Sequence, residues 1–139
     1  MKRDSKLSLA LHALGHMAQQ PERPLRSEDF GLAQGTNPVV VRRVLGLLRL
    51  AGILTSARGH DGGWRLARAA EAITIADVYR ALDESIIAKP GKGPENPSHC
   101  AIERTLQATM DDALKQAEDL LIGRLSGITI ADIAQAQTH

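Results

Sequence analysis

One cysteine and a pair of helix-spaced histidines are the side chains of this sequence best suited to covalent or metal chemistry. Cys100 directly follows His99, and His12 and His16 lie four residues apart. A helix start favours a thiolate, so Cys100, where a loop meets a predicted helix, is a candidate redox or electrophile sensor. The alternative is an inert cysteine that packs as a small apolar residue. The histidine spacing is compatible with a metal, but without a third ligand it is typical of ordinary helix-face groups.

No catalytic set is recognisable in the sequence. A serine or cysteine beside a histidine is common by chance, and nothing here forms a nucleophile, a base and an orienting group, so we do not expect an enzyme. The single cysteine excludes an internal disulfide and, by itself, the usual four-thiolate cluster.

Basic side chains are the more numerous candidates for binding a ligand, and charge is distributed unevenly along the chain. Residues 1–68 contain eleven Lys and Arg against five Asp and Glu, a net charge of +6, whereas residues 69–139 contain six against eleven, a net charge of −5. A basic half suits a polyanion and an acidic half repels one. The alternative is an uneven but merely solvated surface.

The elements that position these residues are predicted to be mainly helical. Apolar residues make up 43% of the chain but aromatic residues only 2%, which is typical of packed helices. Leu7, Leu11 and Leu14 recur at helical spacing, and this first helix is predicted to end at Gln20, before the prolines at 21 and 24.

Two further helices are predicted before residue 52. Ser27 is the expected N-cap of a short helix that runs to about Gln34 and closes at Gly35, and Asn37 with Pro38 is expected to open the next. One face of that third helix is apolar, with Val41, Val44, Leu45 and Leu48. The opposite face carries Val39, Val40, Arg42 and Arg43 near the amino end.

A β-hairpin and a fourth helix follow. Gly52 is expected to end the third helix, and residues 53–58 are predicted to pair with residues 64–68 across a glycine-rich turn. Thr74 with Asp77 resembles a capping box at the start of the fourth helix. The pentapeptide Ile-Thr-Ile-Ala-Asp occurs at 73–77 and again at 128–132. We interpret the two copies as the same helix-capping sequence used at the start of two different helices.

A long carboxyl-terminal helix is predicted after a loop over residues 84–98. Apolar residues advance along this helix by steps of three and four, as in a helix that pairs with another helix. They are Ile102, Leu106, Met110, Ala113, Ala117 and Leu120. Gly127 is expected to break the helix, and Thr129 with Asp132 to cap a final short one.

Three helices followed by a hairpin, with a basic amino end on the third helix, is the layout of a winged helix-turn-helix. Arginine can bond guanine edges or phosphates, whereas valine offers apolar contact to a thymine methyl group. Ser27, at a helix start, is a possible phosphate ligand, and the wing can enter the minor groove. The predicted DNA-binding residues are Ser27, Asn37, Pro38, Val39, Val40, Arg42, Arg43, Arg58, Gly59, His60, Gly62 and Gly63.

The chain resembles the Rrf2 family of bacterial regulators, which includes iron-sulfur, nitric-oxide and thiol sensors. The resemblance covers nearly the whole chain and is most specific in the wing, where Arg58-Gly59-His60-Asp61-Gly62-Gly63-Trp64-Arg65-Leu66 matches the pattern Arg-Gly-x-x-Gly-Gly-aromatic-x-Leu. It implies a homodimer whose long helices cross and whose two winged domains bind a palindromic operator. Iron-sulfur members carry three cysteines before the long helix, and this chain has only Cys100, so we expect no cluster and no other cofactor.

These observations predict a cytoplasmic DNA-binding regulator, expected to be a repressor, with double-stranded operator DNA and a second copy of the chain as partners and with no membrane association. We expect a winged helix-turn-helix over 1–83, a flexible sensor loop over 84–99, and a dimerisation helix with a short last helix over 100–139. Cys100 is the candidate sensor. Two alternatives remain: a regulator that responds to a small ligand or metal with Cys100 inert, and a winged domain that binds only protein partners.

Overall fold

Helices dominate the part of the chain that the structure describes, which is residues 5–58, 63–82 and 100–136 of a computed structural model. Residues 1–84 form one compact unit together with residues 125–139, and residues 85–124 form a second. The buried apolar side chains of the described residues all lie in the first unit. The winged domain therefore has its own core.

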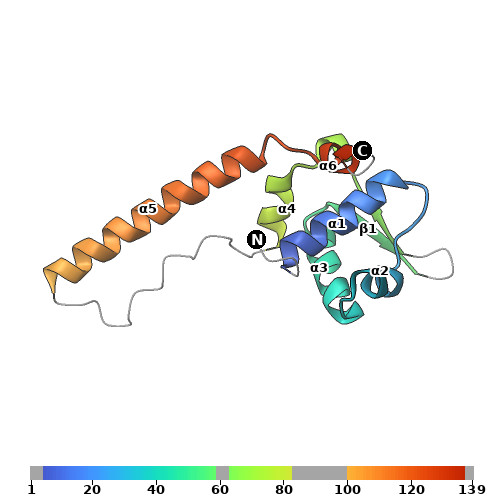
Figure 1. The fold of residues 1–139 in the computed structure, drawn as a ribbon, viewed down its shortest axis with the longest axis horizontal. Helices are drawn as coiled ribbons and strands as arrows, with labels where there is room; N and C mark the ends of the chain where they lie inside the picture. The colour runs from blue at the N-terminus through green and yellow to red at the C-terminus, as the bar shows by residue number, and fades with distance from the viewer. Residues whose placement is uncertain (1–4, 59–62, 83–99, 137–139) are drawn as a thin grey trace. The chain divides into compact units, whose positions relative to one another are not determined.

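Helix α1 spans Lys6–Gln19 (Figure 1). It begins beside a capping hydroxyl. The Oγ atom of Ser5 accepts a hydrogen bond from the backbone N–H of Ser8 at 3.1 Å, which satisfies one of the donors left open at a helix start. The helix ends at Gln20, as predicted. Leu7 and Leu14 are buried, and so contribute the apolar face that the spacing indicated.

Helix α2 spans Ser27–Gln34, and its start corrects one prediction. The N-cap is Arg26 and no side chain caps the helix, so Ser27 is not the cap. The reason is tertiary: the Ser27 hydroxyl accepts a hydrogen bond from the indole Nε1–H of Trp64 at 2.8 Å. The helix closes at Gly35, whose φ of 66° suits glycine, as predicted.

Helix α3 spans Pro38–Leu50 and begins as the sequence predicts. The Oδ1 atom of Asn37 accepts a hydrogen bond from the backbone N–H of Val39 at 2.8 Å, and Pro38 is the first helical residue. The apolar residues predicted for the inner face are buried, namely Val41, Val44, Leu45 and Leu48. Burial of this stripe fixes which face of α3 points outward.

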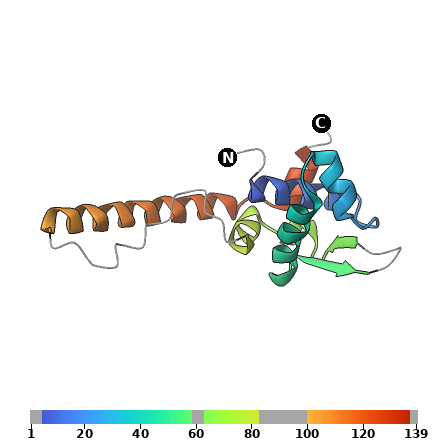
Figure 2. The same cartoon turned by 90° about the horizontal axis from the view of Figure 1, so that it is seen from below.

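The predicted hairpin is present, with shorter strands than expected. Strand β1 spans Leu54–Ala57 and pairs antiparallel with β2, Gly63–Leu66, so that Ser56 lies opposite Trp64. Ile53, expected in the strand, is instead a buried residue between α3 and β1. Figure 2 shows the two strands side by side beyond the carboxyl end of α3.

The two copies of the repeated pentapeptide pair with each other. The short 3-10 helix η1 (Ala70–Ala72) precedes helix α4 (Ile75–Ala81), and the last helix is α6 (Ile130–Ala136). Thr74 and Thr129 lie directly before α4 and α6 and form an antiparallel bridge with each other. The Ile75 N–H donates to the Ile128 carbonyl and the Ile130 N–H to the Ile73 carbonyl, both at 2.9 Å.

This bridge ties the end of the chain to the winged domain. The Gln19 amide of α1 also donates to the Ala134 carbonyl of α6 at 3.2 Å, and Ile130 is fully buried. We expected residues 100–139 to form one carboxyl-terminal segment. The structure divides that segment at Leu125 and groups the last helix with the first 84 residues, because the buried face of α6 completes their core.

Helix α5 spans Ala101–Leu125, and all of its residues except Leu125 belong to the second unit. None of its residues is buried. The helix ends two residues before Gly127, close to the predicted break. The predicted sensor loop, 84–99, lies outside the described residues.

Candidate nucleic-acid interface

The first two turns of α3 present the predicted contact residues outward. Val39 and Val40 are 52% and 39% exposed, whereas Val41 and Val44 on the inner face are buried. Arg42 and Arg43 are exposed on the same outer side. These four side chains can reach a ligand without disturbing the core, because the helix packs on the core through the buried side chains of Val41 and Val44.

Asn37 and Pro38 shape this helix start. The Oδ1 atom of Asn37 is committed to capping Val39, so the group of Asn37 that can donate to a base or phosphate is Nδ2. Pro38 packs against α2: a Cβ placed on Gly31 would lie 3.4 Å from Pro38 Cα and only 2.8 Å from the Thr36 carbonyl oxygen. Pro38 thus helps to set the turn between α2 and α3.

The wing is attached to the loop before α2 by main-chain hydrogen bonds. The Leu25 N–H donates to the Trp64 carbonyl at 2.9 Å, and the Trp64 N–H donates to the Leu25 carbonyl at 2.8 Å. The hydrogen bond from the Trp64 indole to Ser27 adds a side-chain link between the wing and α2. The base of the hairpin is therefore held in a definite position relative to the recognition helix.

Gly63 is required at the base of the wing for a reason that the sequence did not show. Its φ is 138°, and a Cβ at this position would lie 2.8 Å from the Leu25 carbonyl oxygen and 2.9 Å from Pro24 Cβ. Gly63 is one of the predicted DNA-binding residues. The close approach observed in the structure is to the chain's own backbone.

The other predicted wing residues are only partly within the described chain. Arg58 is exposed directly after β1. Gly59, His60 and Gly62 lie outside the described residues.

Ser27 was predicted as a phosphate ligand, and its surroundings favour a positioning role. Its exposure is 8%, and its Oγ atom accepts the hydrogen bond from Trp64. Trp64 and Leu25 are residues that sequence reasoning missed. The available signal was the indole N–H of Trp64, which needs an acceptor once it is partly buried.

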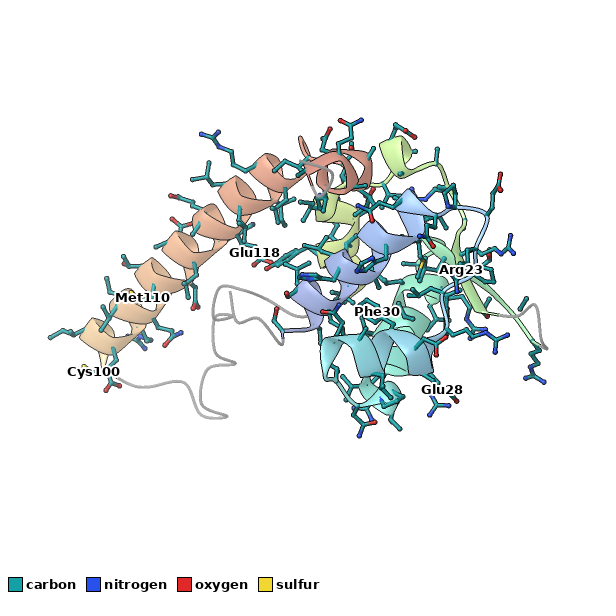
Figure 3. All side chains as sticks on the ribbon, turned by 45° about the vertical axis from the view of Figure 1, so that its right-hand side comes forward. Arg23, Glu28, Phe30, Cys100, Met110 and Glu118 are labelled. Atoms are coloured by element: carbon teal, nitrogen blue, oxygen red, sulfur yellow. The ribbon has the colours of Figure 1, made fainter. Side chains whose placement is uncertain are left out.

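Cys100 lies at the amino end of α5, as predicted, and is exposed (Figure 3). Its carbonyl oxygen accepts the backbone N–H of Arg104 at 3.1 Å, so it stands at the N-cap position. The chain has one cysteine, whereas iron-sulfur clusters are held by about four thiolate ligands. The donor set therefore does not fit such a cluster.

The two histidines of α1 are engaged in different contacts. A ring nitrogen of His12, Nδ1, lies 2.8 Å from the Ser8 carbonyl oxygen, and the His16 ring packs edge-on against Phe30 with centroids 6.0 Å apart. Within the described residues no three His, Cys, Asp or Glu side chains are grouped as a metal would require. In the same part of the chain, no helix combines the length and apolar character needed to cross a bilayer.

A recognition helix with an exposed basic start, packed on two helices and flanked by a hairpin, defines a winged helix-turn-helix protein of the DNA-binding class. The chain belongs to the Rrf2 family, described as "Iron-dependent Transcriptional regulator", which matches residues 3–136. It is therefore a DNA-binding transcriptional regulator and not an enzyme, which confirms the resemblance and the class inferred from sequence.

Individual relatives agree with this assignment. The chain is 30% identical over 133 residues to YwnA of Bacillus subtilis (strain 168), across 94% of this chain and 95% of YwnA. It is 34% identical over 89 residues to the HTH-type transcriptional regulator IscR of Erwinia tasmaniensis, across 64% of this chain and 50% of that protein.

Solved structures show the same fold. The structure of T. potens IscR matches with a TM-score of 0.68 at 22% identity, over 99% of this chain and 88% of the other. The structure of CymR, the global cysteine regulator of B. subtilis, matches with a TM-score of 0.64 at 24% identity, over 98% of each chain. The predicted fold, a winged helix-turn-helix followed by a long helix, is confirmed.

Proposed function

We propose that this regulator is a homodimeric repressor that binds a palindromic operator, with α3 in the major groove and the wing beside it. Two features together carry the proposal. The outer face of the first two turns of α3 is exposed, and the hairpin is attached to the loop before α2 by the main-chain hydrogen bonds between Leu25 and Trp64. A helix fits the major groove, and a wing held at fixed distance contacts the flanking backbone or minor groove.

Direct base reading in this proposal rests on few residues. Arg42 and Arg43 bond guanine edges or phosphates, and the exposed valines contact thymine methyl groups. Arg58 adds a cation at the wing.

Dimerisation is assigned to α5. The apolar side chains predicted to form its seam are exposed in the single chain, with Ile102 at 78% and Leu106 at 60%. A stripe of this kind on a 25-residue helix is stabilised by a second helix that covers it. Two copies paired through α5 would present two recognition helices to the two halves of a palindrome.

Cys100 is the proposed sensor, and we propose that the protein works without an iron-sulfur cluster. Its exposed thiol stands at the N-cap of α5, the helix assigned to dimerisation, so oxidation or alkylation there can change how the two recognition helices are spaced.

The DNA assignment is tested with the double variant Arg42→Gln/Arg43→Gln on DNA from upstream of the regulator's own gene. Each base-reading arginine lost should cost roughly 1–3 kcal/mol of binding free energy, and each lost phosphate contact should reduce the slope of log K against log salt by about 0.9. Gel-shift titrations at several salt concentrations measure both. Arg80→Gln, which removes one exposed cation from α4, is the control. Operator binding equal to that of the native chain would remove α3 from the interface.

The sensor assignment is tested with Cys100→Ser. The variant should bind the operator like the reduced native protein and should not respond to peroxide or to an electrophile. Footprinting with reduced and oxidised native protein provides the reference. If Cys100→Ser still releases DNA on treatment, the thiol is a bystander and the regulator answers to another signal.

A further inference from the structure

A pocket of about 240 Å³ opens within the winged domain, between the carboxyl half of α1, the loop that follows it and α2. Its apolar lining includes Met17 and Phe30, which are 3% and 4% exposed, together with Leu25. Figure 3 labels Phe30, between α1 and α2, and Arg23, on the loop that joins them. The volume is smaller than the roughly 300–1,000 Å³ of typical ligand pockets, so it suits a small molecule.

The polar part of the lining has more positive than negative side chains, beside the neutral amides of Gln19, Gln20 and Gln34. Arg23 and Arg26 contribute two positive charges, Asp29 one negative charge, and His16 a ring that packs against Phe30 with an interplanar angle of 71°. Guanidinium groups bind carboxylates through paired hydrogen bonds of high directionality. The pocket thus combines an aromatic and aliphatic wall with a rim that attracts an anion.

We propose that this pocket binds a small organic carboxylate with an apolar body, and that its occupancy changes operator affinity. The carboxylate lies against Arg23 and Arg26, and the apolar body packs on Leu25 and on the small exposed parts of Met17 and Phe30. This is a site of different chemistry and position from Cys100. The binding half of the proposal stands on the pocket alone, whereas the coupling half rests on the proposed function.

Two walls of the pocket, the loop after α1 and helix α2, are hydrogen-bonded to the wing and to the residues just before α3. Leu25, on the loop, exchanges both main-chain hydrogen bonds with Trp64 at the base of the wing. The wall formed by α2 connects to α3, because the Thr36 N–H donates to the Gly31 carbonyl at 2.8 Å just before the recognition helix begins. The Trp64 indole also donates to Ser27 of α2, so a ligand that moves the loop relative to α2 would strain one of the two links of Trp64 and so change how the wing lies relative to α3.

Binding is tested on the full chain, without DNA, with benzoate, phenylacetate and isovalerate as probes and benzyl alcohol as the uncharged match of benzoate. Amide chemical-shift titrations should show saturable changes that are largest at residues 16–34 and extend to Trp64, whose main chain is hydrogen-bonded to Leu25, for at least one carboxylate. Binding of benzyl alcohol should be at least about tenfold weaker. The double variant Arg23→Gln/Arg26→Gln should lose at least about tenfold in affinity, while Arg80→Gln should not change it. Ala33→Leu, which fills the pocket without removing a charge, should also weaken binding.

Failure of all three carboxylates to bind, or equal binding to the double variant, overturns the proposal. If no carboxylate binds and Arg23→Gln weakens operator affinity more than Arg80→Gln does, the rim serves a DNA phosphate and the proposal is equally overturned.

Coupling is tested by repeating the operator titration with the bound carboxylate at saturation. Operator affinity should change at least about threefold for the native chain and stay constant for the double variant. A saturated pocket with unchanged operator affinity overturns the coupling half. If the chain binds the carboxylate but binds no operator with or without it, the proposed function fails and the binding half of the proposal stands. The two failures can be distinguished because the chemical-shift titration is carried out without DNA.

Discussion

At the scale of single residues, the interface depends on side chains that do not face DNA. Trp64 links the wing to two positions at once: its backbone pairs with Leu25, and its indole N–H donates to the Ser27 hydroxyl. Ser27 is 8% exposed, so an unpaired indole or hydroxyl at this place would be poorly solvated. The position of the wing therefore follows from one partly buried hydrogen bond as well as from the strand pairing.

We predict that Ser27→Ala destabilises the fold by about 1–3 kcal/mol, because it leaves the indole N–H without its acceptor. Trp64→Phe removes the donor as well as ring area, and the two changes combined should cost less than their sum, since they remove one shared interaction. Urea unfolding of the two single variants and the double variant measures this coupling. Costs that add within about 0.5 kcal/mol would show that the hydrogen bond contributes nothing.

At the scale of elements, the two copies of the repeated pentapeptide hydrogen-bond to each other and so connect the starts of α4 and α6. Thr74 and Asp77 form a complete capping box, in which the Asp77 N–H donates to the threonine hydroxyl and the aspartate accepts the Thr74 N–H. Thr129 and Asp132 repeat both bonds, at 3.2 and 2.9 Å. The bridge between the two threonines then couples α4 to α6.

We predict that Thr129→Ala lowers stability by about 0.5–2 kcal/mol and also speeds amide exchange at Ile75, which is remote in sequence. The physical reason is that the Ile75 N–H donates to the Ile128 carbonyl, whose position depends on the second cap. Hydrogen-exchange NMR reads this single amide. Thr109→Ala on α5 is the control, because that hydroxyl only bonds the Thr105 carbonyl on an exposed surface. Unchanged exchange at Ile75 in Thr129→Ala would mean that the two caps act independently.

At the scale of the whole molecule, the two halves of the chain are built for different tasks. The amino-terminal half is basic, while the half that includes α5 is acidic, so DNA is attracted to the winged domain and repelled by the long helix. No residue of α5 is buried, and its exposed apolar side chains include Met110 at 50% and Leu120 at 68%. Such a helix needs a partner surface for its apolar stripe.

We predict that Leu106→Glu/Met110→Glu converts the protein into a monomer, because four charges would meet at the seam of the paired helices. Sedimentation velocity measures the change, and circular dichroism checks that the winged domain stays folded. The control is Ala108→Glu, which adds a charge to the same helix away from the seam. A dimer that survives the double substitution would place the contact elsewhere.

Local patterns were sufficient to predict most elements of this fold. Helix ends at Gln20 and Gly35, the Asn37 cap and both threonine caps depend on a few neighbouring residues, and the structure has them where expected. The outward face of α3 followed from periodicity, because residues three or four apart share one side of a helix. Charge distribution and the wing motif together indicated DNA binding.

The amino-acid sequence was therefore sufficient for the order of the elements and for the outward face of α3, because both depend on short-range spacing. The class of protein followed from the uneven charge and from the family resemblance of the wing motif. The roles of Ser27, Gly63 and the second pentapeptide became visible in the folded chain alone. They depend on Trp64, Leu25 and the first pentapeptide, which lie 37, 38 and 55 residues away in the sequence. Sequence spacing carries no information on which distant groups meet, because that is settled by how the buried faces of the helices pack together.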